Sequence, residues 1–217
     1  MILLHGASGF VAKHLIFSFE KLGRNFCIQT RDVNKIKKNN IKVLDSNIKN
    51  LSKKDILFIK QKIETLVYVS GIAHTNQINI FKKIILKKKY NDDISQFQSY
   101  LKIYKDSNLK RIIFLSSSKI NETYNNQLIN EDNKIINKSN YSKYKLTLEN
   151  IIIKFCANSK TTYTIIRPPM IYGIGFKGNL NMLIKIIKIG LPLSLIDFKS
   201  SRSYLFIDNL VSFISSI

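Results

Sequence analysis

The chain has 217 residues, of which 45% are hydrophobic, and a formal net charge of +21 at pH 7. That length is enough for one substantial apolar core, with room for a small second lobe. Lysines interrupt every apolar stretch, including residues 180–196, before it reaches the roughly 18 apolar residues that a membrane span needs. The composition therefore indicates a globular, soluble protein without membrane insertion.

The lysines are spread along the whole chain beside many isoleucines and asparagines. They do not gather with aromatic residues into a patch, so we expect no specific nucleic-acid partner and only a non-specific attraction of anionic ligands. They also do not segregate to one helix face, which disfavours a role at a membrane surface. Cys27 and Cys156 fall in apolar segments as buried thiols, and the three histidines are too scattered to hold a metal.

The first sixteen residues predict a strand, a glycine turn and a helix. Residues 2–4 are apolar, Gly6 permits a tight turn, and Gly9 lets a pyrophosphate approach the backbone because it has no Cβ. Free N–H groups at the start of the helix would face the phosphates. The alternative is a tight turn without a ligand. Because the strand starts at residue 2, there is no room for a signal peptide, and we expect a cytoplasmic protein.

Strand and helix patterns then alternate along the chain. The further predicted strands are 26–30, 41–44, 66–69, 111–115 and 162–166. The predicted helices are 10–22, one that starts at a capping box of Ser52 and Asp55, 79–106 and 141–156. Residues 119–138 are expected to form a loop, and 32–40 a loop or a short helix. This alternation predicts an α/β fold with a doubly wound parallel sheet.

In such sheets ligands bind outside the carboxyl ends of the strands. The residues at those ends are Gly6 to Gly9, Arg31, Asp45, Ser70-Gly71, Ser116 to Ser118 and Arg167 to Pro169. We expect them to converge on one crevice. The sequence therefore predicts a single ligand site that is built from several strand ends.

Tyr141 and Lys145 share one face of a predicted helix, one turn apart. An ammonium about 4 Å from a phenol is worth on the order of 4 kcal/mol at an effective dielectric near 20, or roughly three pKa units. We therefore expect Lys145 to lower the pKa of Tyr141 toward neutrality, so that the phenol can act as a general acid or base. Ser117 could hold the same substrate oxygen. The alternative is a chance pair in a lysine-rich chain.

These motifs resemble those of the extended short-chain dehydrogenases/reductases of the NAD-dependent epimerase/dehydratase family. The segment G-A-S-G-F-V-A at 6–12 is similar to the family's G-x-x-G-x-x-G, and Ser117, Tyr141 and Lys145 fall on its Ser-Tyr-Lys triad. Segments 167–180, 190–193 and 202–210 resemble a branch that makes bacterial surface sugars. That branch contains 4-epimerases and reductases of UDP-4-keto-6-deoxy-N-acetylhexosamines.

The resemblance covers the whole chain and implies a Rossmann-type dinucleotide-binding domain over 1–167, followed by a small, incomplete C-terminal substrate lobe over 168–217. The cofactor-binding residues that it implies are Gly6, Ser8, Gly9, Phe10, Val11, Arg31, Asp45, Ser46, Gly71, Tyr141, Lys145 and Pro168. Asp45 and Ser46 match the place where the family contacts adenine, and Gly71 matches the place where the backbone passes the cofactor. Ser117, Asn179 and Arg202 would contact the substrate, the last two at its diphosphate.

The end of the second predicted strand bears on the choice of cofactor. An acidic residue there would hold the ribose of NAD, whereas a basic one can pair with the 2′-phosphate of NADP. Thr30 stands at the acidic position and Arg31 follows, which favours NADP, while Asp32 keeps NAD open.

The function implied by the resemblance is NAD(P)-dependent hydride transfer at C4 of a UDP sugar, in the synthesis of bacterial surface polysaccharide. Tyr141 would exchange the hydroxyl proton, in an epimerase or in a 4-keto-reductase. A homodimer through a helix pair that includes 141–156 is also implied, although an apolar helix face equally suits an ordinary core.

The chain departs from the family pattern at three places. Ser70-Gly71 replaces an alanine pair, and Ile94-Ser95 replaces the glycine-threonine that follows the family's asparagine. The chain also ends at Ile217, just inside a helix expected to begin near Asp208, whereas the resembling enzymes continue. We therefore expect either a fragment or a shortened product, or a protein that works without part of the substrate lobe. The rival function is a catalytically idle, truncated dinucleotide-binding protein that senses cofactor or binds RNA.

Overall fold

The computed structural model describes residues 1–31, 33, 40–72, 80–121, 139–176, 179–190 and 203–217. Six parallel strands form its main sheet, in the order β3-β2-β1-β4-β5-β6. Their bounds are β1 Ile2–His5, β2 Phe26–Thr30, β3 Val43–Asp45, β4 Thr65–Tyr68, β5 Arg111–Leu115 and β6 Thr162–Ile166. The prediction of a doubly wound, Rossmann-type parallel sheet is confirmed, and β2, β5 and β6 have the predicted bounds. The strand order reverses between β1 and β4, and sheets of this kind bind their ligands outside the carboxyl ends of the strands at such a point.

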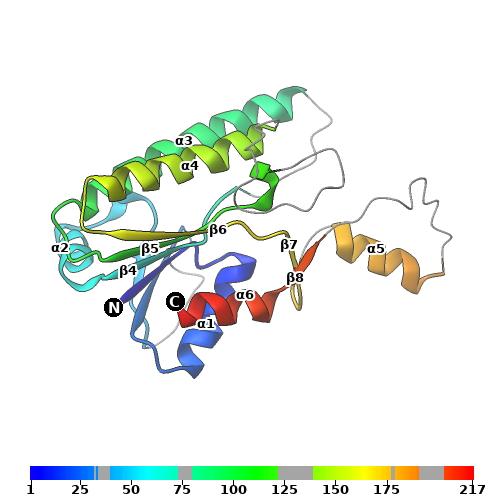
Figure 1. Ribbon diagram of the computed structural model, residues 1–217, viewed down its shortest axis with the longest axis horizontal. Coiled ribbons are helices and arrows are strands. Elements are labelled where there is room, and N and C mark those ends of the chain that lie inside the picture. Colours follow the sequence, from blue (N-terminus) through cyan, green and yellow to red (C-terminus); the bar gives the residue numbers. More distant parts are fainter. Residues whose placement is uncertain (32, 34–39, 73–79, 122–138, 177–178, 191–202) are drawn as a thin grey trace.

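Helices cover both faces of this sheet (Figure 1). On one face α3 (Ile80–Tyr104) and α4 (Asn140–Ala157) run side by side, and α1 (Phe10–Lys21) and α6 (Ile207–Ser216) pack together on the other. Helix α2 (Lys53–Lys62) begins at the predicted capping box, in which Ser52 and Asp55 bond to each other's backbone. Short 3₁₀ turns, η2 (Ile48–Asn50) and η3 (Ser118–Asn121), follow β3 and β5. Over the described residues, no helix has both the length and the apolar content needed to cross a membrane.

The central strands are buried because both of their faces carry apolar side chains. One apolar cluster lies between the sheet and α2, α3 and α4, and it includes Leu66, Phe97, Ile112 and Leu148. The other lies between the sheet and α1 and α6. The two clusters thus cover both faces of the sheet.

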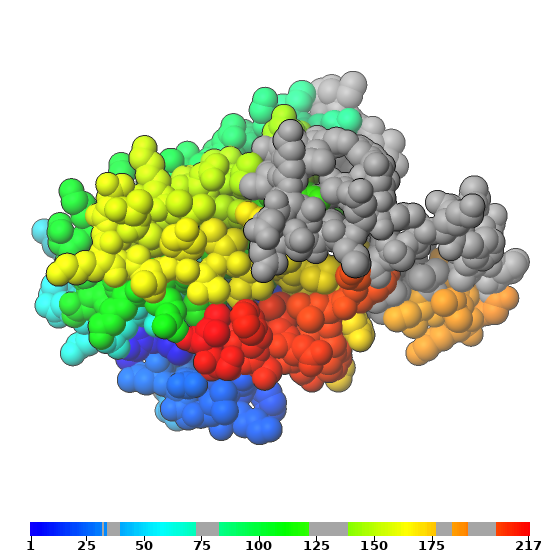
Figure 2. Space-filling model, in the orientation of Figure 1, coloured from blue at the N-terminus to red at the C-terminus, as the bar shows by residue number. Residues whose placement is uncertain are grey.

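Two short strands, β7 (Met170–Tyr172) and β8 (Tyr204–Phe206), form a second parallel sheet, and α5 (Asn179–Lys188) lies between them in the chain. The sequence prediction missed these three elements. The two strands have only three residues each, which carry too little periodicity to stand out. Helix α6 starts directly after β8 and presents Ile207, Leu210 and Ile214 to the cluster that contains α1. Figure 2 shows α6, in red, against the blue N-terminal part of the chain. The domain division at residue 167 stays a prediction. Although α6 follows this residue, it packs together with α1 against the six-stranded sheet.

A side chain at Gly6 would overlap with the backbone of the segment that follows β4. The φ of Gly6 is +94°, and a Cβ there would lie 2.8 Å from the backbone N and Cα of Ser70. These are backbone atoms of the segment after β4, so no side-chain rotation can relieve the overlap. The turn after β1 and the end of β4 can approach this closely only with glycine at position 6.

We predict that Gly6→Ala lowers the free energy of unfolding by about 3 kcal/mol or more, from strain together with steric overlap. Gly23→Ala is the matched control, because φ is +61° there and no atom lies within 4 Å of the added Cβ. Its cost is expected to be about 1 kcal/mol, from backbone strain alone. Urea unfolding at constant m measures both values, and equal losses for the two variants would refute the close approach at Gly6.

Candidate active site

The turn between β1 and α1 has the features of a phosphate site. The N–H of Gly9 donates to the carbonyl of Gly6 at 2.9 Å, and the first helical bond runs from Lys13 N to Gly9 O at 3.1 Å. Gly9 is the N-cap and supplies no side-chain acceptor, so the N–H groups of the first turn are not capped by a side chain. Ser8 and Gly9 are exposed. The residues present therefore fit the pyrophosphate of a dinucleotide.

The ends of β2 and β3 lie beside this turn. Thr30 is buried and Arg31 is exposed. The carboxylate of Asp45 accepts hydrogen bonds from Asn47 N at 2.7 Å and from Asn50 Nδ2 at 2.8 Å, so it also holds the turn η2 in place. The hydroxyl of Ser46 is buried and has no hydrogen-bond partner within the described residues. A buried polar atom without a partner at the predicted adenine position leaves a hydrogen bond to offer to a bound group.

Two polar residues at these strand ends were missed by the sequence prediction of the site. His5 ends β1 and stacks on Tyr68, with ring centroids 4.4 Å apart. Burial, followed by the charge of Arg31, lowers the pKa of His5 to about 3, so the imidazole is neutral at physiological pH. Gln29 is fully buried in β2, and its Nε2 donates to the carbonyl of Asp45 at 2.7 Å. Both stand out in the sequence only as polar residues inside apolar strands.

Ser117 and Tyr141 are brought together by β5 and α4. Ser117 follows β5, and α4 begins at Asn140 with Ser139 as its N-cap. The side chains of Ser117 and Tyr141 share a hydrogen bond, which lowers the pKa of the phenol, but the larger effect is burial, which raises it. The net pKa of Tyr141 is above its usual value. The expectation that the phenol titrates near neutrality is therefore wrong for this structure, because spacing along a helix does not reveal how deeply a ring is buried.

Lys145 lies beneath the same strand ends. Its ammonium donates to the carbonyl of Leu115 at 2.9 Å and lies 4.9 Å from the centre of the Phe114 ring. A Cβ added to Gly71 would be 2.9 Å from Nζ, so Gly71 makes room for the ammonium. Burial lowers the pKa of Lys145 to about 8, against the opposing charges of Asp93 and Glu149. The side chain thus remains largely protonated at neutral pH.

A buried ion pair ties α4 to the segment that follows β6. Arg167 donates from Nε at 3.1 Å and from Nη2 at 2.7 Å to the two carboxylate oxygens of Glu149, whose side chain is 1% exposed. Its Nη1 reaches Oδ1 of Asn121, in η3, at 3.2 Å. The carbonyl of Pro168 accepts from Ser118 N at 3.0 Å. These bonds fix the backbone on either side of Ser117 and Pro168.

The structure thus brings most of the predicted site residues to one edge of the sheet. Ser117 contacts Tyr141, Lys145 lies beside Gly71, and the turn that contains Gly6, Ser8, Gly9, Phe10 and Val11 leads into α1. The side chain of Asn179, which begins α5, and the whole of Arg202 lie outside the described residues. Their predicted contacts with the substrate diphosphate stay predictions.

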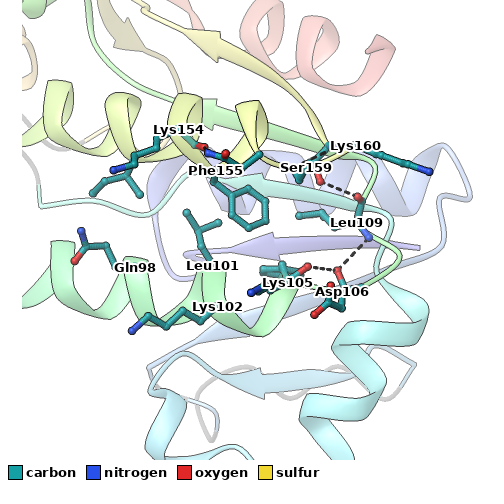
Figure 3. Close-up of a pocket in the computed structure, with 15 residues that line it drawn as sticks. Gln98, Leu101, Lys102, Lys105, Asp106, Leu109, Lys154, Phe155, Ser159 and Lys160 are labelled. Atoms are coloured by element: carbon teal, nitrogen blue, oxygen red, sulfur yellow. Dashed lines mark hydrogen bonds between the residues drawn. The ribbon is translucent and has the colours of Figure 1, made fainter.

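A cavity with a volume of about 550 Å³ lies elsewhere, between the C-terminal ends of α3 and α4. Figure 3 shows Leu101 and Phe155 within it and lysines around it, among them Lys102 and Lys154. Leu109 and Thr161, which also line it, precede β5 and β6. The cavity is therefore at the edge of the sheet opposite to Ser117 and takes no part in the candidate active site.

Comparison with known proteins adds to this geometry. Residues 2–217 match the model of the NAD dependent epimerase/dehydratase family. The chain belongs to this family. It is 27% identical over 224 residues to a UDP-glucose 4-epimerase from Vibrio cholerae, with 98% of the chain and 65% of the relative covered. It is 25% identical over 239 residues to a dTDP-D-glucose 4,6-dehydratase from Dictyostelium discoideum, with 97% of the chain and 54% of the relative covered. The chain thus spans less than two thirds of the length of these curated relatives.

A solved structure supports the fold. The UDP-glucuronic acid 4-epimerase from Bacillus cereus, in complex with a 4-deoxy-4-fluoro derivative of its UDP sugar and NAD, superposes with a TM-score of 0.79 at 20% identity. The match covers 99% of this chain and 72% of that one. This family member therefore has the Rossmann-type fold of known epimerases.

The ion pair of Glu149 and Arg167 yields a stability prediction. Arg167→Met leaves the Glu149 carboxylate buried without its cation, and we expect a loss of about 3 kcal/mol in the free energy of unfolding at pH 7. Urea unfolding at pH 7 measures the change.

The double variant Glu149→Gln/Arg167→Met is the control, because it removes both charges and should recover most of the lost stability. A loss that persists fully in the double variant would contradict the role of this charge pair.

Proposed function

We propose that this protein is an NAD(P)-dependent enzyme that transfers hydride at C4 of a UDP sugar, as an epimerase or a 4-keto-reductase. The observation that carries the proposal is the hydrogen-bonded Ser117 and Tyr141, with the buried cation of Lys145 nearby, at the same strand ends as an uncapped glycine turn. Membership of the NAD-dependent epimerase/dehydratase family supports it. The named activity of the Vibrio relative and the UDP sugar in the Bacillus complex support the class of substrate.

The bound nicotinamide would accept a hydride from the substrate carbon or return one to it. Tyr141 moves the matching proton: its phenolic oxygen takes the proton of the C4 hydroxyl as the carbonyl forms, and gives it back in reverse. Its raised pKa keeps the phenol protonated at rest, which suits the direction in which the carbonyl is reduced. Ser117, already bonded to that phenol, orients the same substrate oxygen.

Lys145 supplies positive charge at this place. Its ammonium is held by the Leu115 carbonyl and lies against Gly71, where the backbone is expected to pass the cofactor. We assign it the nicotinamide ribose as its partner and a stabilising effect on the phenolate that forms in turnover. The resemblance of residues 167–180 supports a place in the synthesis of surface polysaccharide, and a homodimer through α4 is part of the same proposal.

The central prediction concerns Tyr141. Tyr141→Phe should lower kcat for a UDP-4-keto sugar with NADPH by about 10²- to 10⁴-fold, because the proton donor is lost while the ring remains. Nicotinamide absorbance measures reduction, and separation of the UDP sugars measures epimerisation. Tyr163→Phe, on a half-exposed ring of β6, is the control and should keep full activity.

If the folded wild-type protein neither oxidises the cofactor nor epimerises any UDP sugar, the enzymatic function is refuted. Salt-sensitive RNA binding that persists in Tyr141→Phe would then support the idle, truncated binding protein instead.

Cofactor choice is tested at Arg31. The exposed guanidinium after β2 suits the 2′-phosphate of NADP, and Arg31→Ala should weaken NADPH binding by about tenfold or more while NADH binding changes by less than about twofold. Quenching or enhancement of nicotinamide fluorescence gives both Kd values. Lys21→Ala, at the exposed far end of α1, removes the same charge and should change neither. Equal effects on the two cofactors would refute the assignment.

A further inference from the structure

Tyr144 occupies an unusual position between α3 and α4. It is 2% exposed, and its ring stacks on Tyr90 of α3 with centroids 4.5 Å apart and planes inclined by 14°. Its hydroxyl donates to a carboxylate oxygen of Asp93, also on α3. The two helices run side by side over this face of the sheet (Figure 1), and this hydrogen bond joins them through a half-buried carboxylate acceptor.

The same hydroxyl also reaches the segment that follows β4. The backbone N–H of Ile72 donates to it. A Cβ added to Gly71 would lie 3.5 Å from this hydroxyl oxygen and 2.9 Å from Nζ of Lys145. The Tyr144 hydroxyl and the Lys145 ammonium therefore flank one point of the Gly71 backbone.

Among the described residues, Asp93 is one of two carboxylates whose charge acts on Lys145. Two carboxylates favour the charged form of this ammonium, first Asp93 and then Glu149. The charge of Glu149 is offset by the two hydrogen bonds from Arg167. Asp93, in contrast, receives the neutral hydroxyl of Tyr144. Its charge is left to compensate the burial of the lysine.

We propose that Asp93, oriented by Tyr144, is a positioning residue that keeps the Lys145 ammonium charged and seated against Gly71. The catalytic consequence of this pair rests on the proposed function, whereas its electrostatic effect can be measured without substrate. Without the Asp93 charge, the buried ammonium has only the Leu115 carbonyl, the aromatic faces and a Glu149 already paired with Arg167.

The other ionisable groups around Lys145 do not replace this charge. Among the described residues they include Tyr144, whose ring centre lies 5.9 Å from Nζ, the three tyrosines around that ring (Tyr68, Tyr90 and Tyr141), and Glu149, which is paired with Arg167. Burial raises the pKa of each of the three tyrosines, so they stay neutral near pH 8. None of these groups is therefore expected to supply the negative charge that Lys145 loses when Asp93 is replaced.

The test compares Asp93→Asn with Asp92→Asn in the full chain. The two residues are adjacent on α3 and each variant removes one carboxylate, but Asp92 is exposed whereas Asp93 is half-buried. NMR of isotopically labelled lysine, with Lys145 assigned through Lys145→Met, follows its ionisation. We expect Asp93→Asn to lower the pKa of Lys145 from about 8 by about one unit, because the charged form loses its anion, and Asp92→Asn to leave it in place.

A second variant keeps the ring and removes only the hydroxyl. Tyr144→Phe should lower the same pKa by less than Asp93→Asn does, since the carboxylate remains but is no longer held. If Asp93→Asn does not fold, as judged by circular dichroism, Tyr144→Phe carries the test. A Lys145 pKa that stays within error of the wild-type value in the folded variant overturns the proposal.

Turnover separates this inference from the proposed function. In an active enzyme, the basic limb of the kcat profile should move to lower pH in Asp93→Asn and not in Asp92→Asn. A wild-type protein without activity, in which the Lys145 pKa nevertheless responds to Asp93, would refute the enzymatic function and leave the coupling intact. An active enzyme without the pKa response would refute the coupling alone.

Discussion

The close approach of the backbones at Gly6 and Ser70 is the constraint on which the site depends. Strands β1 and β4 are neighbours at the point where the strand order reverses, and the segments that follow them leave the sheet there. Because no side chain separates them, the backbone of the glycine turn packs directly against the backbone of the segment that carries Gly71. The N–H groups of the first turn of α1, which no side chain caps, and the lysine ammonium could therefore contact one extended ligand.

Burial has opposite consequences for the two basic side chains nearest to this point. His5 is enclosed by aromatic rings and has a cation, Arg31, nearby, so it is neutral over the physiological pH range. Lys145 is equally enclosed, but it has a carbonyl acceptor, two aromatic faces and carboxylates around it. The high net charge of the chain plays no visible part in this difference. Local partners decide the protonation of each group.

The sequence predicted the sheet well because parallel strands buried on both faces are continuous apolar runs. Strand β5, R-I-I-F-L, is such a run, with four buried residues, whereas the edge strand β6, T-Y-T-I-I, is partly exposed; both have the predicted bounds. The short strands β7 and β8 have no such run. The link between Tyr144 and Asp93 was also beyond prediction, since it depends on the register of α4 against α3, and residues 51 positions apart leave no local pattern. The pKa of Tyr141 was mispredicted for a related reason. Spacing along a helix shows which side chains share a face, but it does not show how deeply a ring is buried.

The contact between α1 and α6 has a consequence for how the chain is made. The apolar residues of α1, among them Leu15 and Phe19, share a cluster with Ile207 and Ile214. During synthesis at about 5 to 20 residues per second, α1 emerges first and then waits on the order of ten seconds or more for the helix that covers it. Over that interval its apolar face is open to the ribosome surface and to chaperones. The nascent protein can therefore reach its final packing only after nearly the whole of this sequence has left the exit tunnel.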